Sequence, residues 1–225
     1  MQSVYTSWSG GKDSCFACYK AAESGLKVRY LLNMKSEDGE RSWIHGFSSE
    51  LLKMQAQAIG IPLVQRRPTM ATYETDYKDA VLFLKKWGVG GGVFGDIDLE
   101  EHRQWVERVC QEVDITPHLP LWGLSQEKIL KDFIGLGFEA IVVVVKAKFF
   151  DEEWLGRKVD SDFLSYLSEL KGTKGVTPCG EAGEYHTFVT DGPLFKQRIE
   201  ILEANKVLRG EGWFLDILKS ELRDK

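Results

Sequence analysis

The sequence predicts an α/β fold: a five-stranded parallel sheet with helices on both faces, plus a smaller C-terminal α/β domain. Short strand-forming runs alternate with helical segments through the first half of the chain, as in βαβ units. A glycine-rich hexapeptide, residues 9–14, lies between the first strand and the first helix. The alternation changes near 118–124, so we expect two domains, over 1–121 and 122–225.

In the first domain, strands and helices follow each other in order. Apolar residues at helical spacing, with stops at Gly60 and Gly88, mark the helices. Strands are predicted over 4–8, 28–34, 61–64, 89–94 and within 114–121, and helices over 15–22, 49–59, 69–87 and 100–113. Ser48 or Ser49 is expected to cap the second helix. Right-handed connections then place helices on both faces of the sheet.

The second domain has a different pattern. A dense β-branched run predicts a buried strand over 140–145, and helical segments are predicted over 125–136 and 160–170. A glycine-rich stretch, a segment dense in polar residues, a turn and two apolar runs complete the chain, at 172–175, 178–189, 191–193, 199–202 and 213–217.

The hexapeptide 9–14 has the composition of a phosphate-binding loop. Its two glycines let the backbone approach a ligand without a Cβ in the way. The first turn of the following helix offers free N–H groups, and the helix dipole favours an anion there. Lys12 adds a positive charge and the two serines add hydroxyl donors. The spacing matches neither the Walker A loop nor Gly-x-Gly-x-x-Gly.

Three segments are expected to face one crevice. In open parallel sheets a ligand binds beyond the carboxyl ends of the strands, where the strand order reverses. The hexapeptide follows the first strand, while 34–46 and 95–101 follow the second and fourth. His45 is therefore a candidate contact to nucleotide phosphates or ribose, or a cap of the next helix.

A second motif, residues 179–188, combines two glycines, two carboxylates and a histidine. This density favours a loop that positions side chains, although a solvated turn into a strand is the simpler interpretation. Glu181 and Glu184 are candidates to hold a magnesium ion, orient an amine or act as a base. His186 is a candidate to shuttle a proton or bind a phosphate.

The composition excludes several classes of protein. With 225 residues, 43% of them hydrophobic, the chain can bury a core without disulfides. Its net charge of −5 argues against a general nucleic-acid binder. No apolar run approaches the roughly 18–20 residues of a membrane span, and no signal segment opens the chain, so we expect a cytoplasmic location. A homo-oligomer stays open.

The chain has four cysteines, of which Cys15 and Cys18 form a C-x-x-C pair. Both follow the hexapeptide on an apolar helix, and no second pair completes a zinc site. Packing is therefore favoured over metal or redox chemistry.

Ser-Gly-Gly-Lys-Asp-Ser resembles the PP-loop of the ATP pyrophosphatase superfamily, whose Rossmann-like members cleave ATP between the α- and β-phosphates. With its later motifs, nearly the whole chain resembles the diphthine–ammonia ligase family. Those motifs lie at 45–46, 57–64, 95–97, 154–157, 180–189 and 191–195.

The resemblance implies an AMP-forming ligase that makes a carbon–nitrogen bond. The family adenylates the carboxylate of diphthine, on translation elongation factor two, releases pyrophosphate, and transfers the acyl group to ammonia to give diphthamide. ATP and Mg²⁺ are the implied cofactors, with ATP expected on residues 1–121 and the acceptor on 122–225. Another amine stays open as the donor in place of ammonia. The implied ATP contacts are Ser9, Gly10, Gly11, Lys12, Asp13, Ser14, Met34, His45, Gly95 and Asp96. The candidate catalytic residues are Lys12, Asp13, Glu181, Glu184 and His186, and Asp13 is also a candidate magnesium ligand or helix cap.

Two positions depart from the family pattern. His186 stands where the family usually carries an acidic residue, and Trp8 resembles a bacterial-type branch that does not make diphthamide. A different carboxylate therefore stays open as the acceptor. Two further functions stay open as well: RNA thiolation, which would need Cys179 as a sulfur carrier, and ATP binding without catalysis.

Overall fold

The computed structural model describes residues 1–37 and 48–225 and divides into two compact units. Unit 1 contains Met1–Ser9 and Asp13–Trp122, and unit 2 contains Gly10–Lys12 and Gly123–Lys225. The phosphate loop, residues 9–14, therefore contributes to both units, whereas a single cut after residue 121 leaves it in the first. The assignment of ATP to one part and the acceptor to the other stays a prediction.

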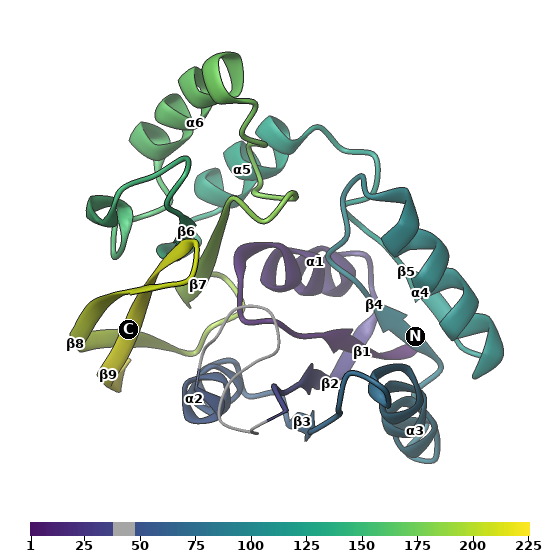
Figure 1. Ribbon diagram of the computed structural model, residues 1–225. Helices are drawn as coiled ribbons and strands as arrows, with labels where there is room; N and C mark the ends of the chain where they lie inside the picture. The colour runs from purple at the N-terminus through teal and green to yellow at the C-terminus, as the bar shows by residue number, and fades with distance from the viewer. Residues whose placement is uncertain (38–47) are drawn as a thin grey trace. The chain divides into compact units, whose positions relative to one another are not determined.

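Unit 1 contains the predicted five-stranded parallel sheet, in the order β3-β2-β1-β4-β5 (Figure 1). Its strands are β1 (Ser3–Ser7), β2 (Lys27–Met34), β3 (Leu63–Arg66), β4 (Gly91–Val93) and β5 (Thr116–His118). The central strand β1 pairs with β2 on one side and β4 on the other. The strand order therefore reverses at β1, the strand that leads into the phosphate loop.

Four helices connect these strands: α1 (Lys12–Glu23), α2 (Ser49–Ile59), α3 (Tyr73–Lys85) and α4 (Glu100–Glu112). Figure 1 shows α1 and α3 on opposite sides of the sheet, as right-handed connections require. Ser48 caps α2 by accepting a hydrogen bond from the Leu51 N–H at 3.2 Å. The predicted helix boundaries are close, except that α1 begins at Lys12 instead of residue 15 and α3 begins at Tyr73 instead of residue 69.

Two boundaries shift for local reasons. The hydroxyl groups of Thr69 and Thr72 accept hydrogen bonds from each other's backbone N–H, at 2.9 and 3.2 Å, and form a turn before α3. The strand predicted over 61–64 begins at Leu63, because Pro62 has no N–H to donate to a neighbouring strand.

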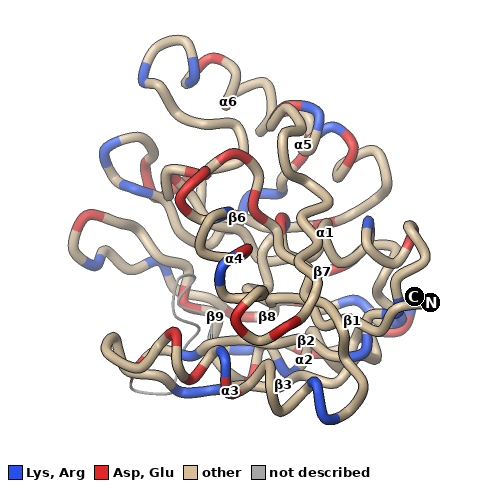
Figure 2. The backbone as a smooth tube through the Cα atoms, turned by 90° about the vertical axis from the view of Figure 1, so that its right-hand side faces the viewer, with Lys and Arg blue, Asp and Glu red and all other residues tan. Residues whose placement is uncertain are grey.

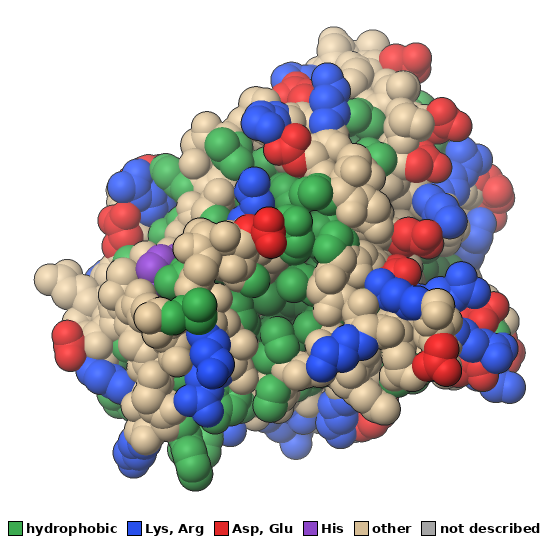
Figure 3. Space-filling view, turned by 180° about the vertical axis from the view of Figure 1, so that it is seen from behind, with side chains coloured by type: hydrophobic (Ala, Val, Ile, Leu, Met, Phe, Trp, Pro, Cys, Tyr) green, Lys and Arg blue, Asp and Glu red, His purple; other side chains and the backbone are tan. Residues whose placement is uncertain are grey.

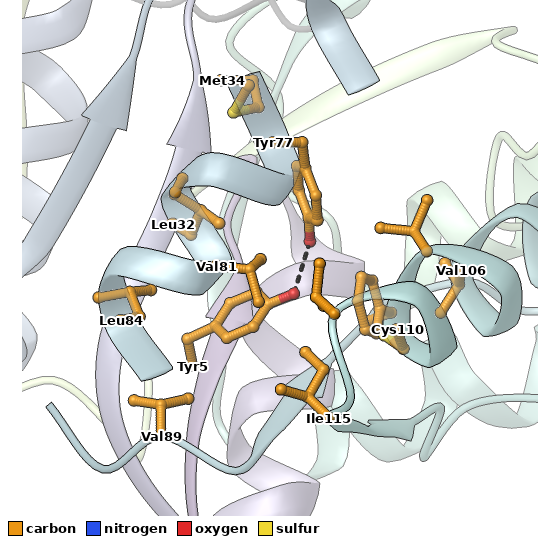
Figure 4. Packing of buried hydrophobic residues seen from close by; sticks show 14 residues of the cluster. Tyr5, Leu32, Met34, Tyr77, Val81, Leu84, Val89, Val106, Cys110 and Ile115 are labelled. Atoms are coloured by element: carbon orange, nitrogen blue, oxygen red, sulfur yellow. Dashed lines mark hydrogen bonds between the residues drawn. The ribbon is translucent and has the colours of Figure 1, made fainter. Parts of the chain in front are cut away.

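One hydrophobic core packs α3 and α4 against the same face of the sheet (Figure 4). Its buried members come from β1, β2, α3, α4 and the segments around β4 and β5. The hydroxyl groups of Tyr5 and Tyr77 lie 2.9 Å apart inside this core and form a hydrogen bond. Burial raises the pKa of both phenols, so both stay neutral.

Replacing Tyr77 by phenylalanine is expected to destabilise the fold by about 1–3 kcal/mol, because the Tyr5 hydroxyl is left buried without its partner. The double variant Tyr5→Phe/Tyr77→Phe removes both polar atoms, so it should cost less than the sum of the two single changes. Urea denaturation of all four proteins measures this coupling, and strictly additive costs would contradict the hydrogen bond.

Unit 2 combines two helices with a four-stranded antiparallel sheet in the order β7-β6-β9-β8. Its elements are α5 (Gln126–Gly135), β6 (Glu139–Lys146), the 3₁₀ turn η1 (Glu152–Trp154), α6 (Ser161–Lys174), β7 (Tyr185–Asp191), β8 (Gln197–Arg209) and β9 (Gly212–Asp224). The predicted strand and both helices are present. The long β8–β9 hairpin was not predicted, and α6 continues through the glycine-rich stretch to Lys174.

An aromatic cluster forms part of the core of unit 2. The Tyr185 ring on β7 packs edge-on against Phe150 and Phe163, with centroids 6.1 and 5.1 Å away. Trp154 stacks on Tyr166 at 4.0 Å. This packing fixes the Tyr185 ring, which matters for the loop described below.

Charged residues of both signs are interspersed along the chain (Figure 2) and over the face drawn in Figure 3. A protein that binds nucleic acid through phosphate contacts instead gathers Lys and Arg on one face. Within residues 1–37 and 48–225, none of the helices combines the length and apolarity that crossing a bilayer requires.

Candidate active site

The phosphate loop joins the end of β1 to the start of α1, as predicted. Gly10 has φ 83°, a left-handed conformation in which a Cβ is strained. The Ser9 N–H and hydroxyl both donate to the Ser14 hydroxyl oxygen, at 3.3 and 3.0 Å. These bonds close the loop across its ends and place both hydroxyl groups together.

Gly95, in the segment after β4, lies against the backbone of this loop within unit 1. A Cβ added to Gly95 would lie 2.9 Å from the Asp13 carbonyl carbon and 2.9 Å from the Ser14 nitrogen. Only glycine allows this approach. The structure therefore brings together Ser9, Asp13, Ser14 and Gly95, four of the predicted nucleotide contacts.

The Lys12 side chain is buried in unit 2, with 3% of the residue exposed. Its ammonium donates a hydrogen bond to the Cys179 carbonyl oxygen. It also lies 5.1 Å from the centroid of the Tyr185 ring, in cation–π geometry. A carbonyl dipole and an aromatic face both attract an ammonium, so these two contacts hold the Lys12 side chain in one place.

Strand β7 also binds the backbone of the tripeptide Gly10–Lys12. The Lys12 N–H donates to the Thr187 hydroxyl oxygen at 3.1 Å. The Val189 N–H donates to the Gly10 carbonyl oxygen at 3.1 Å. Because Gly10–Lys12 belongs to unit 2, the middle of the phosphate loop is shaped by β7 as well as by its own turn.

Glu184 has its carboxylate occupied by a partner just before the second motif, and its catalytic role stays a prediction. It is 2% exposed, and both carboxylate oxygens accept hydrogen bonds from Thr177, at 2.6 Å from the N–H and 3.0 Å from the hydroxyl. This geometry stabilises the turn between the two residues. Glu181 lies half-buried in that turn, and its catalytic role stays a prediction.

His186 lies on β7, opposite Val144 of β6. Burial is the main cause that lowers its pKa to about 4, and the positive charges of Lys12 and Lys146 lower it further. The imidazole is therefore neutral at pH 7. A neutral imidazole can donate one hydrogen bond to an anion. A bound anion would offset the two lysine charges and raise the pKa of His186.

The pKa of His186 predicts how the stability of the protein changes with pH. Between pH 6.5 and about 4, an unfolded chain binds a proton at this histidine and the folded chain does not. The folded state therefore loses stability as the pH falls through this range, by at most about 3 kcal/mol from this group. Urea denaturation of His186→Gln should show a shallower loss than the unchanged protein. Equal slopes would contradict the lowered pKa.

The remaining predicted nucleotide contacts have different surroundings. The Asp96 carboxylate lies 3.2 Å from Nδ1 of His102, on the next helix. The Met34 side chain is buried in the core of unit 1, so only its backbone is suited to meet adenine. His45 lies outside the described residues. Contacts of all three with ATP stay predictions.

Cys15 and Cys18 are buried, free thiols. Burial raises the pKa of Cys15 well above its usual value and that of Cys18 to about 11, which opposes thiolate chemistry. Cys179 is buried too, and its thiol donates to the Gln126 carbonyl oxygen at 3.4 Å. These surroundings suit packing, as predicted for the pair, and do not suit a sulfur carrier.

Within the described ranges, no group of three or more His, Cys, Asp and Glu side chains could hold a metal ion. Magnesium does not need such a group when it is bound with a nucleotide, because one or two carboxylates and the phosphates suffice. Asp13, in the first turn of α1, fits that limited requirement.

Sequence reasoning missed several residues of this site. Thr177, Tyr185 and Thr187 lie in or beside the second motif, but a hydroxyl group carries no signal of its own in a sequence. Gln126 and Lys146 lie far from the motif in the chain. The sequence does not indicate their partners: Gln126 lies 53 positions from Cys179, and Lys146 lies 36 positions from Ala182.

Comparison with known families gives two matches that together cover most of the chain. A family model described as the diphthamide synthase N-terminal domain matches residues 1–117. A second, described as the diphthamide synthase C-terminal domain, matches residues 125–222.

Curated relatives carry a consistent name. A diphthine–ammonia ligase of Homo sapiens is 30% identical over 244 residues, which cover 96% of this chain and 91% of the human protein. The ligase of Bos taurus is 31% identical over 222 residues, covering 89% and 82%.

Among solved structures, a predicted subunit of tRNA methyltransferase from Methanocaldococcus jannaschii aligns with 84% of this chain and 96% of its own. The TM-score is 0.47 and the identity 15%. The strand order of unit 1, and not this alignment, supports the fold.

Proposed function

Because the chain belongs to the diphthamide synthase family, we propose that it is an ATP-dependent, AMP-forming ligase that converts the carboxylate of diphthine to an amide. The observation that carries the proposal is the complete phosphate loop at the carboxyl end of β1, with its left-handed Gly10 and fixed Lys12. The acceptor would be the diphthine side chain of translation elongation factor two. A cytoplasmic location fits an acceptor from the translation machinery.

The reaction has two steps. The acceptor carboxylate attacks the α-phosphorus of ATP, forms an acyl-adenylate and releases pyrophosphate. Ammonia then attacks the acyl carbon, AMP leaves, a proton is lost and the amide forms. AMP is a far better leaving group than the oxygen of a free carboxylate, so the first step makes the second possible.

The residues of the loop would serve the first step. Lys12 offers a fixed positive charge to the pyrophosphate that leaves. The hydroxyl groups of Ser9 and Ser14 and the first N–H groups of α1 would bind phosphate oxygens. Magnesium would neutralise phosphate charge, with Asp13 as its protein ligand.

The proposal is tested with elongation factor two that carries diphthine, incubated with ATP, magnesium and ammonium. We expect AMP, pyrophosphate and the amide in equal amounts, measured by chromatography and mass spectrometry. The factor with an unmodified histidine is the control and should give none. Formation of ADP and phosphate would contradict the proposed chemistry. AMP formation only with another carboxylate would keep the chemistry and replace the acceptor.

A further inference from the structure

Several hydrogen bonds hold the turn before β7 within unit 2: the Lys146 ammonium of β6 donates to the Ala182 carbonyl oxygen at 2.7 Å, and three further side chains anchor residues 177–179. Two of them, Glu184 and Tyr185, belong to the same segment of chain. Glu184 binds Thr177, and the Tyr185 hydroxyl donates to the Pro178 carbonyl oxygen at 2.6 Å. The third, Gln126, lies at the start of α5 and binds Cys179. It is the one anchor of these three that comes from a distant element.

Gln126 holds the Cys179 residue at two points. Its side-chain oxygen Oε1 accepts from the Cys179 N–H at 2.8 Å, and its backbone carbonyl accepts from the Cys179 thiol at 3.4 Å. The two residues are 9% and 2% exposed. Because water has little access to these atoms, the hydrogen bonds are strong, and water cannot replace one that is lost.

The backbone of Cys179 links Gln126 to the phosphate loop. Its N–H is bound by Gln126, and its carbonyl oxygen accepts from the Lys12 ammonium. We propose that Gln126 is a positioning residue for Lys12: it fixes the Cys179 residue and thereby the carbonyl that orients the ammonium. The inference deepens the proposed function, on which its kinetic consequence rests.

Gln126→Leu removes the acceptor for the Cys179 N–H at nearly constant volume. We expect kcat for AMP formation to fall roughly ten- to hundredfold, because small misplacements of a catalytic group cost about that much. The KM for ATP should change much less. Gln126→Glu keeps an oxygen acceptor and should retain most of the activity.

Ser125→Ala is the matched control. It removes the N-cap of α5, which accepts from the Lys128 N–H at 3.3 Å, and leaves the bonds between Gln126 and Cys179 in place. It should therefore lower the melting temperature without the fall in kcat. Where Gln126→Leu does not fold, Gln126→Asn takes its place, because its shorter side chain withdraws the oxygen.

A second readout does not depend on activity. The full-length protein is treated with a lysine-selective N-hydroxysuccinimide ester, and acylation of each lysine is followed by mass spectrometry. Lys12 should be protected in the unchanged protein, in Gln126→Glu and in Ser125→Ala, and labelled several-fold faster in Gln126→Leu. Equal labelling of Lys12 in Gln126→Leu and the unchanged protein, or an equal rise in Ser125→Ala, would overturn the inference. If the unchanged protein makes no AMP, the proposed function fails and the labelling still decides the role of Gln126.

Discussion

Replacing Lys12 by alanine is expected to reduce AMP formation by on the order of 10³-fold, because the charge on the departing pyrophosphate loses its fixed counter-charge. Lys12→Arg should also be poorly active. The space around the ammonium is shaped by the Cys179 carbonyl and the Tyr185 ring, and a planar guanidinium does not fit the same contacts. Pyrophosphate release in a coupled assay measures both effects.

The control for this prediction is Lys20→Ala. Lys20 lies on the same helix, in its last turn, with its ammonium 5.7 Å from the Phe16 ring centroid. It carries the same charge, so a general electrostatic effect of removing one lysine would appear in both variants. Activity of Lys12→Ala near that of Lys20→Ala would remove Lys12 from the catalytic set.

Replacing Gly95 by alanine should impair both the stability of the protein and its binding of ATP. The new Cβ would meet backbone atoms of Asp13 and Ser14 at 2.9 Å, and backbone cannot turn away as a flexible side chain can. We expect a loss of stability of about 1–3 kcal/mol, typical of overpacking, together with weaker ATP binding as the loop is displaced. Denaturation with urea and titration calorimetry with ATP measure the two parts.

Gly172→Ala is the comparison for Gly95→Ala. Gly172 lies inside α6, and a Cβ there has no neighbour within 4 Å. Alanine should therefore stabilise the helix by about 0.5–1 kcal/mol. If Gly95→Ala were as stable and as active as the unchanged protein, the close approach of Gly95 to the loop would be wrong.

The first half of the fold is predictable because its signals are local. Strands β1, β2 and β3 contain short runs of strand-forming residues, and the helices between the strands end at their own stops, such as Gly60 after α2. The errors arise where a side chain binds the backbone or where the backbone lacks an N–H. The hydroxyl groups of Thr69 and Thr72 delay α3, and Pro62 delays β3.

The β8–β9 hairpin is not predictable in the same way. Its strands are thirteen residues each, but many positions on both faces are partly or fully exposed, so apolar and polar residues do not alternate clearly. Only the apolar runs near 199–202 and 213–217 stand out in the sequence. The hairpin is therefore recognised from the hydrogen-bonded pairing of its two strands and not from their composition.

The candidate site also has a part that the sequence predicts, the phosphate loop, and a part that it does not, the second motif. Every part of the phosphate loop lies within six consecutive residues, so its chemistry is evident from composition and order. The second motif is recognisable as a cluster of ionisable residues, yet burial decides what each does. Glu184 turns inward to Thr177, and His186 becomes a neutral imidazole between lysine charges. Composition alone does not distinguish these outcomes.

The bond between the Lys12 N–H and Thr187 joins positions 175 residues apart. At a synthesis rate of about 5–20 residues per second, a ribosome needs roughly 10–35 seconds to make the intervening chain. During that interval the strands of the parallel sheet can already pair, while the partners of Lys12 do not yet exist. The phosphate loop of a nascent chain therefore reaches its finished form only after β7 has been translated.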